Sequence, residues 1–525
     1  KDLPTFHTYF DPIKAAQSGY IVVIQDCRGR FRSEGTWAPF VDEFQDGYDT
    51  VEWAATLPDS DGQVATWGLS YFGMTQLQAA IMNPPSLKGM VLGQTWGNYL
   101  KGVFWRGGAR QLGSLRYWVQ GVLALDSIIK KYQESDDLPY KLQEYVSLID
   151  NLKESFWVIP LDKSPDPSKV VPYMYEWLER KITDPYWKSL NIDSRYKEIR
   201  VPTFHIGGWY DIFLNGTLEQ FIAMKEQANT TGIQNPRLII GPWEHGKFGS
   251  LVGEEEFGMI SSGSFLNYSG DLTDLHLKWY DAILKKDTST IENEPPVQIF
   301  VMGENKWRNF EDWPVPGSQE EKWYFHSDGN ANSRFGNGHL SRIKPESDEP
   351  YDTFYYDPQD PVPTIGGALL LPEVIQGGAR DQRQNEDRQD VLCYTTDVLE
   401  KDYTVVGSVC VHLYAASSAV DTDFVARLVN VYPNGKAINI TDGIIRASAR
   451  ESYPRPGLIQ PVQPSLIEPD RIYEYTIDMW ATGISFKAGH RIRVEITSSS
   501  FPRWDRNPNT GKDGFVSSES IVAKQ

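Results

Sequence analysis

The stretch QVATWGLSYFGMTQLQAAIMN, residues 63–83, decides the fold of this chain. A short β-rich run leads into Gly68 and Ser70, and apolar residues at helical spacing follow them. This order is typical of a nucleophile elbow, where the chain turns sharply and lifts a serine above the edge of a sheet. The spacing departs from Gly-x-Ser-x-Gly, because Phe72 stands at the second glycine position and Gly73 comes one residue later. A serine that caps the start of a helix is the competing interpretation.

On both sides of this turn, short buried strands alternate with helices. The predicted strands span residues 19–26, 63–67, 88–95, 201–211 and 237–245, and the predicted helices span 42–57, 74–83 and 272–284. Nearly continuous apolar runs such as GYIVVIQD are typical of parallel strands that are buried on both faces. The alternation therefore predicts an α/β sheet with helices on both of its faces.

A helical insertion and a C-terminal β-domain complete the predicted organisation. Residues 97–196 are rich in Trp, Tyr, Leu and Lys at helical spacing and carry few β-rich runs. From about residue 297 onward, β-rich runs alternate with turns, and Asn434-Gly435 is a strong hairpin signal. The segment 376–390 is predicted to be a polar loop. We divide the chain into a split α/β core (1–96 and 197–310), an inserted helical cap (97–196) and a C-terminal all-β sandwich of jelly-roll type (311–525).

Length and composition exclude several classes of protein. The 525 residues exceed a single hydrophobic core, which stops growing near roughly 250–300 residues. The net charge of −19 repels phosphate backbones, so we expect no nucleic acid partner. No apolar run approaches the ~18–20 residues of a membrane span. The three cysteines are odd in number and widely spaced, which argues against a disulfide framework or a zinc site.

Two polar residues follow strands of the predicted sheet and complete a possible triad with Ser70. A serine hydroxyl needs a base, and the base is a histidine that a carboxylate orients. Asp211 ends the run VPTFHIGGWYD, and His245 directly follows the run LIIGPWE. Parallel strands end at one sheet edge, so Ser70, Asp211 and His245 are predicted to meet there. His205 lies inside a strand and is predicted to be a core residue, and Asp26 is interpreted as a structural carboxylate.

Motifs along the whole chain carry a resemblance to a known family. They are GYIVVIQDCRGRFRSEG (19–35), GLSYFG (68–73), GGWYD (207–211), GPWEHG (241–246), YDPQDPVPTIGG (356–367), SSAVDTDFVARLVNVYPNG (417–435) and GHRIRVEITSSSFPRWDRNPNTG (489–511). In this order they resemble the cocaine esterase and glutaryl-cephalosporin acylase family of the Xaa-Pro dipeptidyl-peptidase superfamily. The resemblance implies a serine hydrolase with an α/β-hydrolase core, a helical cap and a jelly roll.

The resemblance also implies roles for single residues. Ser70 matches the nucleophile, Asp211 the triad acid and His245 the general base. Tyr71 matches the residue whose backbone N–H forms half of the oxyanion hole. The positions at or near the family's substrate pocket are Trp105, Trp118, Phe213, Leu370 and Leu371. Core packing is the competing interpretation of the tryptophans.

The beginning of the chain departs from the family. The family's second oxyanion donor is a tyrosine hydroxyl that lies just before the position matched by Lys1. We expect the chain to be a fragment of a longer protein, because a sheet without its first strands would expose unpaired edges. An enzyme that lacks one oxyanion donor loses about 10²–10³ in rate. No signal peptide is visible, which favours a cytoplasmic location over export.

The residues after Asp211 bear on the class of substrate. They read IFLNG, without a carboxylate that could hold the ammonium group of an amino-acid ester or a dipeptide. We therefore predict a serine carboxylic ester hydrolase that acts on aryl or short-chain acyl esters through an acyl-enzyme. It would need a small-molecule ester but no metal and no cofactor, and we allow for a homodimer. An amide or peptide hydrolase of the acylase or Xaa-Pro dipeptidyl-peptidase type is the alternative, followed by a non-catalytic jelly-roll binding protein.

Overall fold

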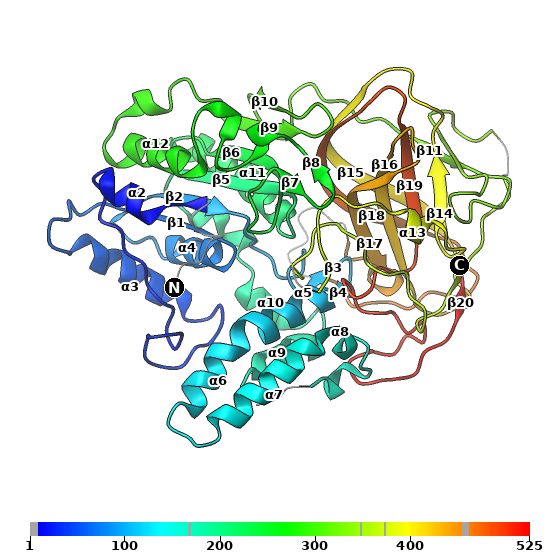
Figure 1. Cartoon of the computed structure of the whole chain (residues 1–525), viewed down its shortest axis with the longest axis horizontal. Coiled ribbons are helices and arrows are strands. Elements are labelled where there is room, and N and C mark those ends of the chain that lie inside the picture. Colours follow the sequence, from blue (N-terminus) through cyan, green and yellow to red (C-terminus); the bar gives the residue numbers. More distant parts are fainter. Residues whose placement is uncertain (1–8, 166–169, 347–348, 372–373, 454–460) are drawn as a thin grey trace. The chain divides into compact units, whose positions relative to one another are not determined.

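The computed structural model describes residues 9–165, 170–346, 349–371, 374–453 and 461–525 (Figure 1). The chain divides into two compact units, and each unit is assembled from two separate stretches. The first unit comprises Lys1–Tyr99 and Ser189–Ser318, and the second comprises Leu100–Lys188 and Gln319–Gln525. Most of the predicted helical cap therefore shares a unit with the predicted C-terminal domain.

A six-stranded sheet runs through the first unit in the order β1-β2-β5-β6-β9-β10. Its strands are β1 (Val64–Leu69), β2 (Leu87–Gly93), β5 (Thr203–Tyr210), β6 (Arg237–Glu244), β9 (Val297–Val301) and β10 (Lys306–Phe310). Within this sheet the neighbours β1, β2, β5, β6 and β9 pair in parallel, and β10 pairs antiparallel with β9. β5 and β6 are buried along almost their whole length, as expected of strands covered on both faces. The predicted strands at 63–67, 88–95, 201–211 and 237–245 are confirmed.

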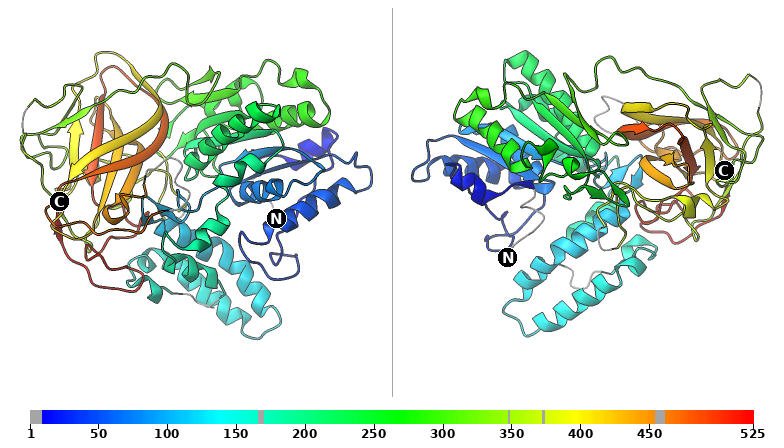
Figure 2. Two further views of the ribbon diagram at one scale, coloured as in Figure 1. Left: turned by 180° about the vertical axis from the view of Figure 1, so that it is seen from behind. Right: turned by 45° about the horizontal axis from the view of Figure 1, so that its top comes forward.

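Helices flank this sheet on both sides (Figures 1 and 2). They are α2 (Pro12–Gln17), α3 (Glu43–Ala55), α4 (Tyr71–Ile81), α11 (Leu214–Thr231) and α12 (Leu272–Leu284). On one side, Leu277 and Trp279 of α12 share a hydrophobic core with Val91 and Ile206 of the sheet. The predicted helices at 42–57, 74–83 and 272–284 are confirmed, although α4 begins at Tyr71 rather than at residue 74. A short hairpin of β7 (Leu251–Val252) and β8 (Glu255–Glu256) follows β6.

The predicted strand at residues 19–26 is wrong. The structure gives this segment no strand, and the side chains of Ile21 and Ile24 are 52 % and 71 % exposed. An apolar run becomes a strand only when a neighbouring strand supplies a ladder of backbone hydrogen bonds. In the described part of the chain β1 has its ladder with β2 alone. The apolar composition was therefore not enough to make residues 19–26 a strand.

The second unit begins with short strands and a set of helices. β3 (Trp105–Arg106) and β4 (Ala109–Arg110) form a hairpin. The helices are α5 (Leu112–Arg116), the π-helix η1 (Tyr117–Leu123), α6 (Ala124–Tyr132), α7 (Leu138–Asp150), α8 (Leu152–Ser155), α9 (Pro172–Glu179) and α10 (Pro185–Leu190). The helical character predicted for residues 97–196 is confirmed. Among the helices that the structure describes, none is long and apolar enough to cross a membrane.

Mostly antiparallel strands build the rest of the second unit. A six-stranded sheet runs in the order β11-β12-β14-β19-β16-β17, and β15-β18 and β13-β20 form two-stranded sheets. The strands are β11 (Tyr324–His326), β12 (His339–Ser341), β13 (Tyr355–Tyr356), β14 (Leu392–Thr395), β15 (Tyr403–Ala415), β16 (Asp423–Val431), β17 (Ala437–Arg446), β18 (Tyr473–Phe486), β19 (Arg491–Thr497) and β20 (Ala523–Lys524). β16 and β17 form the predicted hairpin, in which Gly435 adopts a φ of 82°. The β-rich character predicted for the C-terminal region is confirmed.

The predicted polar loop at 376–390 is wrong in its middle. This segment contains the short helix α13 (Arg383–Glu386), and the side chains of Gln382, Asn385 and Glu386 are fully buried. Glu386 is buried because the guanidinium of Arg493, on β19, pairs with its carboxylate at 2.6 Å. A charged side chain in a polar segment can be buried when a buried side chain of opposite charge pairs with it.

Candidate active site

Ser70 lies at a strained turn between β1 and α4. Its φ of 60° and ψ of −125° are a backbone conformation that residues with a side chain rarely adopt. Hydrogen bonds hold both peptide groups that flank Ser70. The N–H of Ser70 donates to the carbonyl of Gly93 at 2.9 Å, and the hydroxyl of Thr95 donates to the carbonyl of Ser70 at 2.8 Å. Strain that is held in this way is a feature of functional sites.

Close packing explains the displaced second glycine of this turn. A Cβ atom on Gly73 would lie 2.5 Å from the Cβ of Thr95, so only glycine fits there. Phe72, at the position where Gly-x-Ser-x-Gly has its second glycine, is 47 % exposed and meets no such limit. Gly68 has a φ of 152°, and a Cβ atom there would lie 2.6 Å from the Cβ of Phe72. The sharp turn is therefore kept although the second glycine stands one residue later than in Gly-x-Ser-x-Gly.

The structure brings the side chains of Ser70, His245 and Asp211 together in one series of contacts. Ser70 makes no side-chain cap for α4, and its Oγ lies 2.9 Å from Nε2 of His245. Nδ1 of His245 lies 2.6 Å from Oδ1 of Asp211. The Asp211 side chain is fully buried, and that of His245 is 6 % exposed. The three residues follow the carboxyl ends of β1, β5 and β6, as their chain positions predict.

Gln94 is a supporting residue that the sequence analysis missed. Its side chain is fully buried directly after β2. Nε2 of Gln94 donates to the carbonyl of Glu244 at 3.0 Å, and Oε1 accepts from the N–H of Gly246 at 2.7 Å. One amide group thereby holds the backbone on both sides of His245. No local signal could have shown this, because the partners lie 150 residues or more apart in the sequence.

One aromatic side chain lies next to the imidazole of His245, and a second packs on the first. The ring of Phe213 meets it edge-on, with centroids 5.0 Å apart and planes at 89°. The indole of Trp96 packs on Phe213 with a centroid distance of 4.4 Å and is 4 % exposed. Phe213 is a predicted pocket residue, whereas Trp96 was not foreseen. The base therefore has apolar neighbours on one side.

Other histidines of the first unit are poor bases. His205 is fully buried in β5, where its Nε2 lies 2.9 Å from the Thr203 hydroxyl. Burial lowers the pKa of His205 to about 3 and that of His276 to about 4. A base with so low a pKa takes up a proton weakly near neutral pH. The position of His205 agrees with its interpretation as a core residue.

Known proteins resemble this chain along almost its whole length. The model of the X-Pro dipeptidyl-peptidase (S15 family) matches residues 3–247, and that of the X-Pro dipeptidyl-peptidase C-terminal non-catalytic domain matches residues 289–524. Cocaine esterase from Rhodococcus sp. (strain MB1 Bresler) is 36 % identical over 97 % of this chain and 85 % of its own length. The chain belongs to the S15 family. The resemblance that its motifs carry is thereby confirmed. The chain is a serine ester hydrolase.

Further relatives of this S15 hydrolase are more distant. A putative serine esterase of Mycobacterium bovis (strain ATCC BAA-935 / AF2122/97) is 24 % identical over 92 % of the chain and 78 % of its own length. Among solved structures, an α-amino acid ester hydrolase has a TM-score of 0.77 at 23 % identity, covering 97 % of this chain and 84 % of its own. An aminopeptidase from a marine sediment Thaumarchaeota archaeon has a TM-score of 0.75 at 22 % identity, covering 97 % and 83 %. At such identities the two structures show a shared fold alone.

The remaining predicted site residues of the S15 hydrolase fall in both units. Tyr71, the predicted oxyanion donor, is the first residue of α4, and the first N–H groups of a helix have no acceptor inside it. The other four predicted pocket residues belong to the second unit. There Trp105 and Leu371 are 4 % and 1 % exposed, Trp118 stacks on a second tryptophan at 6.1 Å, and the N–H of Leu370 reaches a serine hydroxyl at 3.4 Å. Their role in a pocket stays a prediction.

The described residues offer no metal centre. Within them, no group of three or more His, Cys, Asp or Glu side chains could hold a metal ion. The three cysteines, Cys27, Cys393 and Cys410, are free thiols. Burial raises the pKa of Cys27 to about 12, so this thiol, which precedes the Arg28 turn, is a poor nucleophile. Ser70, whose Oγ lies 2.9 Å from Nε2 of His245, is the better candidate nucleophile.

Proposed function

We propose that this S15 hydrolase cleaves carboxylic esters of the aryl or short-chain acyl type through an acyl-enzyme on Ser70. The observation that carries the proposal is the series of contacts from Asp211 Oδ1 through His245 to Ser70 Oγ, at 2.6 and 2.9 Å. A nucleophile, a base and a group that orients the base are what acyl transfer to serine requires.

In the proposed mechanism His245 carries the proton in both the acylation and the deacylation step. Nε2 of His245 takes the proton of Ser70 while Oγ attacks the ester carbonyl carbon, and the backbone N–H of Tyr71 donates to the oxyanion. His245 then gives its proton to the leaving alcohol, and the acyl group stays on Oγ. A water molecule attacks this acyl group with His245 as base, which releases the acid and restores Ser70. Asp211 accepts from Nδ1 throughout and stabilises the imidazolium.

The surroundings of His245 support an uncharged acyl group. Phe213 is an apolar neighbour of the imidazole, Trp96 packs on Phe213, and Ile212 and Leu214 are apolar and buried as well. A substrate with an α-ammonium group would need a carboxylate there, and the segment IFLNG supplies none. The name of the relative from Rhodococcus, cocaine esterase, supports the same class of substrate.

Peptide hydrolysis is the second candidate. It is favoured by one observation, the match of residues 3–247 to a family named for X-Pro dipeptidyl-peptidases. The same three side chains would serve, but the base would have to deliver its proton to a poorer leaving group. Hydrolysis of Gly-Pro p-nitroanilide at a rate equal to that of p-nitrophenyl butyrate would favour this candidate over the ester proposal.

The deciding experiment is stopped-flow hydrolysis of p-nitrophenyl butyrate by the chain and by its Ser70→Ala variant. We expect a burst of p-nitrophenol from the parent and none from Ser70→Ala. Thr75→Ala is the matched control, because it removes a hydroxyl from the exposed side of the same helix and should keep the burst. A full burst from Ser70→Ala would overturn the assignment of the nucleophile.

A further inference from the structure

Glu43 is a buried carboxyl group beside the turn of Ser70 that the proposed mechanism does not use. It is the first residue of α3 and is 6 % exposed. The hydroxyl of Tyr71 donates to its Oε1, and the indole N–H of Trp37 donates to the same oxygen at 3.2 Å. One carboxylate oxygen therefore joins the loop before α3 to the residue that follows Ser70.

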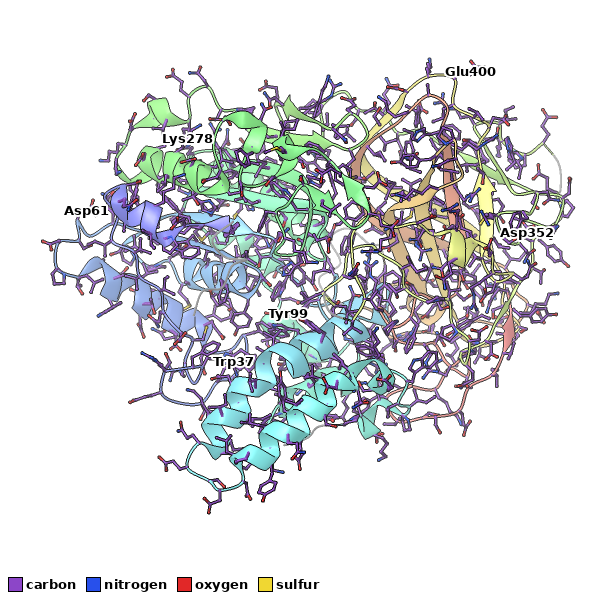
Figure 3. The ribbon with its side chains drawn as sticks, in the orientation of Figure 1. Trp37, Asp61, Tyr99, Lys278, Asp352 and Glu400 are labelled. Carbon is purple, nitrogen blue, oxygen red and sulfur yellow. The ribbon has the colours of Figure 1, made fainter. Side chains whose placement is uncertain are left out.

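The side chain of Tyr71 is enclosed by this loop. Its hydroxyl also accepts from the N–H of Phe40 at 3.3 Å, and its ring lies 5.0 Å from that of Phe40 and 5.8 Å from that of Trp37. Gln78 of α4 donates to the carbonyl of Phe40 at 2.8 Å. The loop and α4 are thereby connected at two points of the helix, Tyr71 and Gln78. Trp37 is labelled in Figure 3, on the loop before α3.

A buried carboxyl group is an expensive way to fill this position. Burial raises the pKa of Glu43, while its bonds to Tyr71 and Trp37 act in the opposite direction. Its second oxygen, Oε2, is buried and has no hydrogen-bond partner among the described residues. A half-satisfied buried carboxyl costs folding free energy, so its presence beside the reacting serine calls for a role in function.

We propose that Glu43 is a positioning residue for the oxyanion hole of this hydrolase. It holds the phenol of Tyr71, and a fixed phenol fixes the rotation of the Tyr71 backbone, whose N–H is the proposed oxyanion donor. The other side of the same peptide is already held through Ser70 and Thr95. Donors to an oxyanion act only when they are placed in advance to within a fraction of an ångström. The inference rests on the proposed function.

The test compares Glu43→Ala, Glu43→Gln and Tyr71→Phe in the full chain with p-nitrophenyl butyrate. We expect Glu43→Ala and Tyr71→Phe each to lower kcat about ten- to hundredfold with little change in KM. Glu43→Gln should keep most of the activity, because the amide oxygen accepts both hydrogen bonds. The double variant Glu43→Ala with Tyr71→Phe should lose little beyond Tyr71→Phe alone, since both changes remove the same hydrogen bond from Tyr71 to Glu43.

Inhibitor binding separates positioning from a general loss of structure. Butylboronic acid becomes tetrahedral on the serine, whereas p-nitrophenyl butyl ether only occupies the ground-state site. In Glu43→Ala the affinity for the boronic acid should fall by the same factor as kcat, and that for the ether should stay. Equal losses for both ligands, or an unchanged kcat in Glu43→Ala, would overturn the inference.

A second carboxylate on the same helix serves as a matched control. Glu52 of α3 accepts from the N–H of Ser86 at 2.9 Å and from its hydroxyl at 3.1 Å, and neither group adjoins the site. Glu52→Ala should keep kcat, and a loss equal to that of Glu43→Ala would overturn the inference. A burst that persists in Ser70→Ala would instead overturn the proposed function, so the two failures are distinguishable.

Discussion

Two buried polar clusters, one in each unit, differ in how completely their charged groups are paired. In the first unit, Ser70, His245 and Asp211 form a single series of contacts, with a strained backbone at the serine. Oδ2 of Asp211 is buried without a hydrogen-bond partner among the described residues. Such a site gives up stability for chemistry. In the second unit, by contrast, the largely buried guanidinium groups of Arg110 and Arg446 each pair with two carboxylates.

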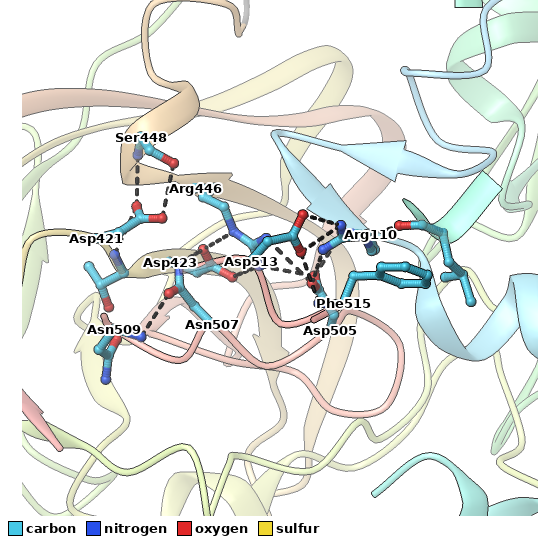
Figure 4. A network of polar contacts seen from close by, with 12 residues as sticks. Arg110, Asp421, Asp423, Arg446, Ser448, Asp505, Asn507, Asn509, Asp513 and Phe515 are labelled. Atoms are coloured by element: carbon cyan, nitrogen blue, oxygen red, sulfur yellow. Dashed lines mark hydrogen bonds and ion pairs between the residues drawn. The ribbon is translucent and has the colours of Figure 1, made fainter. Parts of the chain in front are cut away.

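The polar network of the second unit connects its insertion with its β-strands (Figure 4). The N–H of Arg110 donates to Asp505 at 2.8 Å, and the guanidinium of Arg110 pairs with Asp513 at 2.8 Å. Arg446, on β17, pairs with Asp423 at 2.8 Å and with Asp505 at 2.9 Å. In this cluster several partners offset the cost of burying charge. The difference teaches that the cluster serves stability, whereas the triad leaves a buried carboxylate oxygen unpaired beside the reacting groups.

The largest expected effect is on the first unit. Asp211→Asn keeps the shape of the side chain but removes the charge that orients His245 and stabilises its protonated form. We expect kcat for p-nitrophenyl butyrate to fall about 10⁴-fold, with little change in the free energy of unfolding. Steady-state kinetics and urea unfolding measure the two quantities. A loss of activity below tenfold would remove Asp211 from the triad.

The next largest effect is a loss of stability without a loss of activity, in the second unit. Arg446→Met leaves the buried carboxylates of Asp423 and Asp505 without this cation, and breaking a buried pair costs about 3–5 kcal/mol. We expect a loss of that size in the free energy of unfolding and no change in kcat per folded molecule. Adding Asp423→Asn should recover part of the stability. If Arg446→Met unfolds like the parent, the network is not what holds this unit.

Sequence patterns predicted what depends on neighbours along the chain. The strand runs that end at Ser70, Asp211 and His245 were visible, and so was the hairpin at Asn434-Gly435, because local composition and turn chemistry decide them. The meeting of the three side chains also followed from the rule that parallel strands end at one edge.

Features that depend on distant partners could not be predicted. Residues 19–26 look like a strand but lack a ladder, and the polar residue Glu386 is buried because a buried arginine pairs with it. Gln94 and Glu43 act on groups 150 and 28 residues away in the sequence. No pattern within a window of ten or twenty residues contains such information.

A smaller effect tests the turn itself. Gly73→Ala would place a Cβ atom 2.5 Å from the Cβ of Thr95, and overpacking of this kind costs about 1–3 kcal/mol. Since the Thr95 hydroxyl also holds the Ser70 carbonyl, we expect kcat to fall severalfold along with the stability. Gly249→Ala is the control, because a Cβ atom there would meet nothing within 4 Å. Equal behaviour of the two variants would mean that the turn tolerates a shift of Thr95.

The smallest effect concerns the response of the second unit to pH. Glu495, on β19, is fully buried and lies opposite Arg427 of β16 and Cys393 of β14. The carboxyl of Glu386 is within hydrogen-bond reach, and Arg493 also faces the group. Burial raises the pKa of Glu495 from 4.5 to about 8. Between these values the folded unit keeps a proton that the unfolded chain releases.

The sign of this effect follows from that proton. The contribution of Glu495 is fully present below about pH 4.5 and is lost as the pH rises through about 8. The free energy of unfolding should therefore fall with rising pH in this window, by at most about 1.4 kcal/mol per pH unit. Glu495→Gln keeps an uncharged group of the same shape, so urea unfolding between pH 5 and about 8 should show a flatter slope than the parent. Glu519→Gln, at an exposed position, should keep the parent's slope. Equal slopes in all three proteins would mean that Glu495 is ionised in the folded unit and that the neighbouring arginines stabilise its charge.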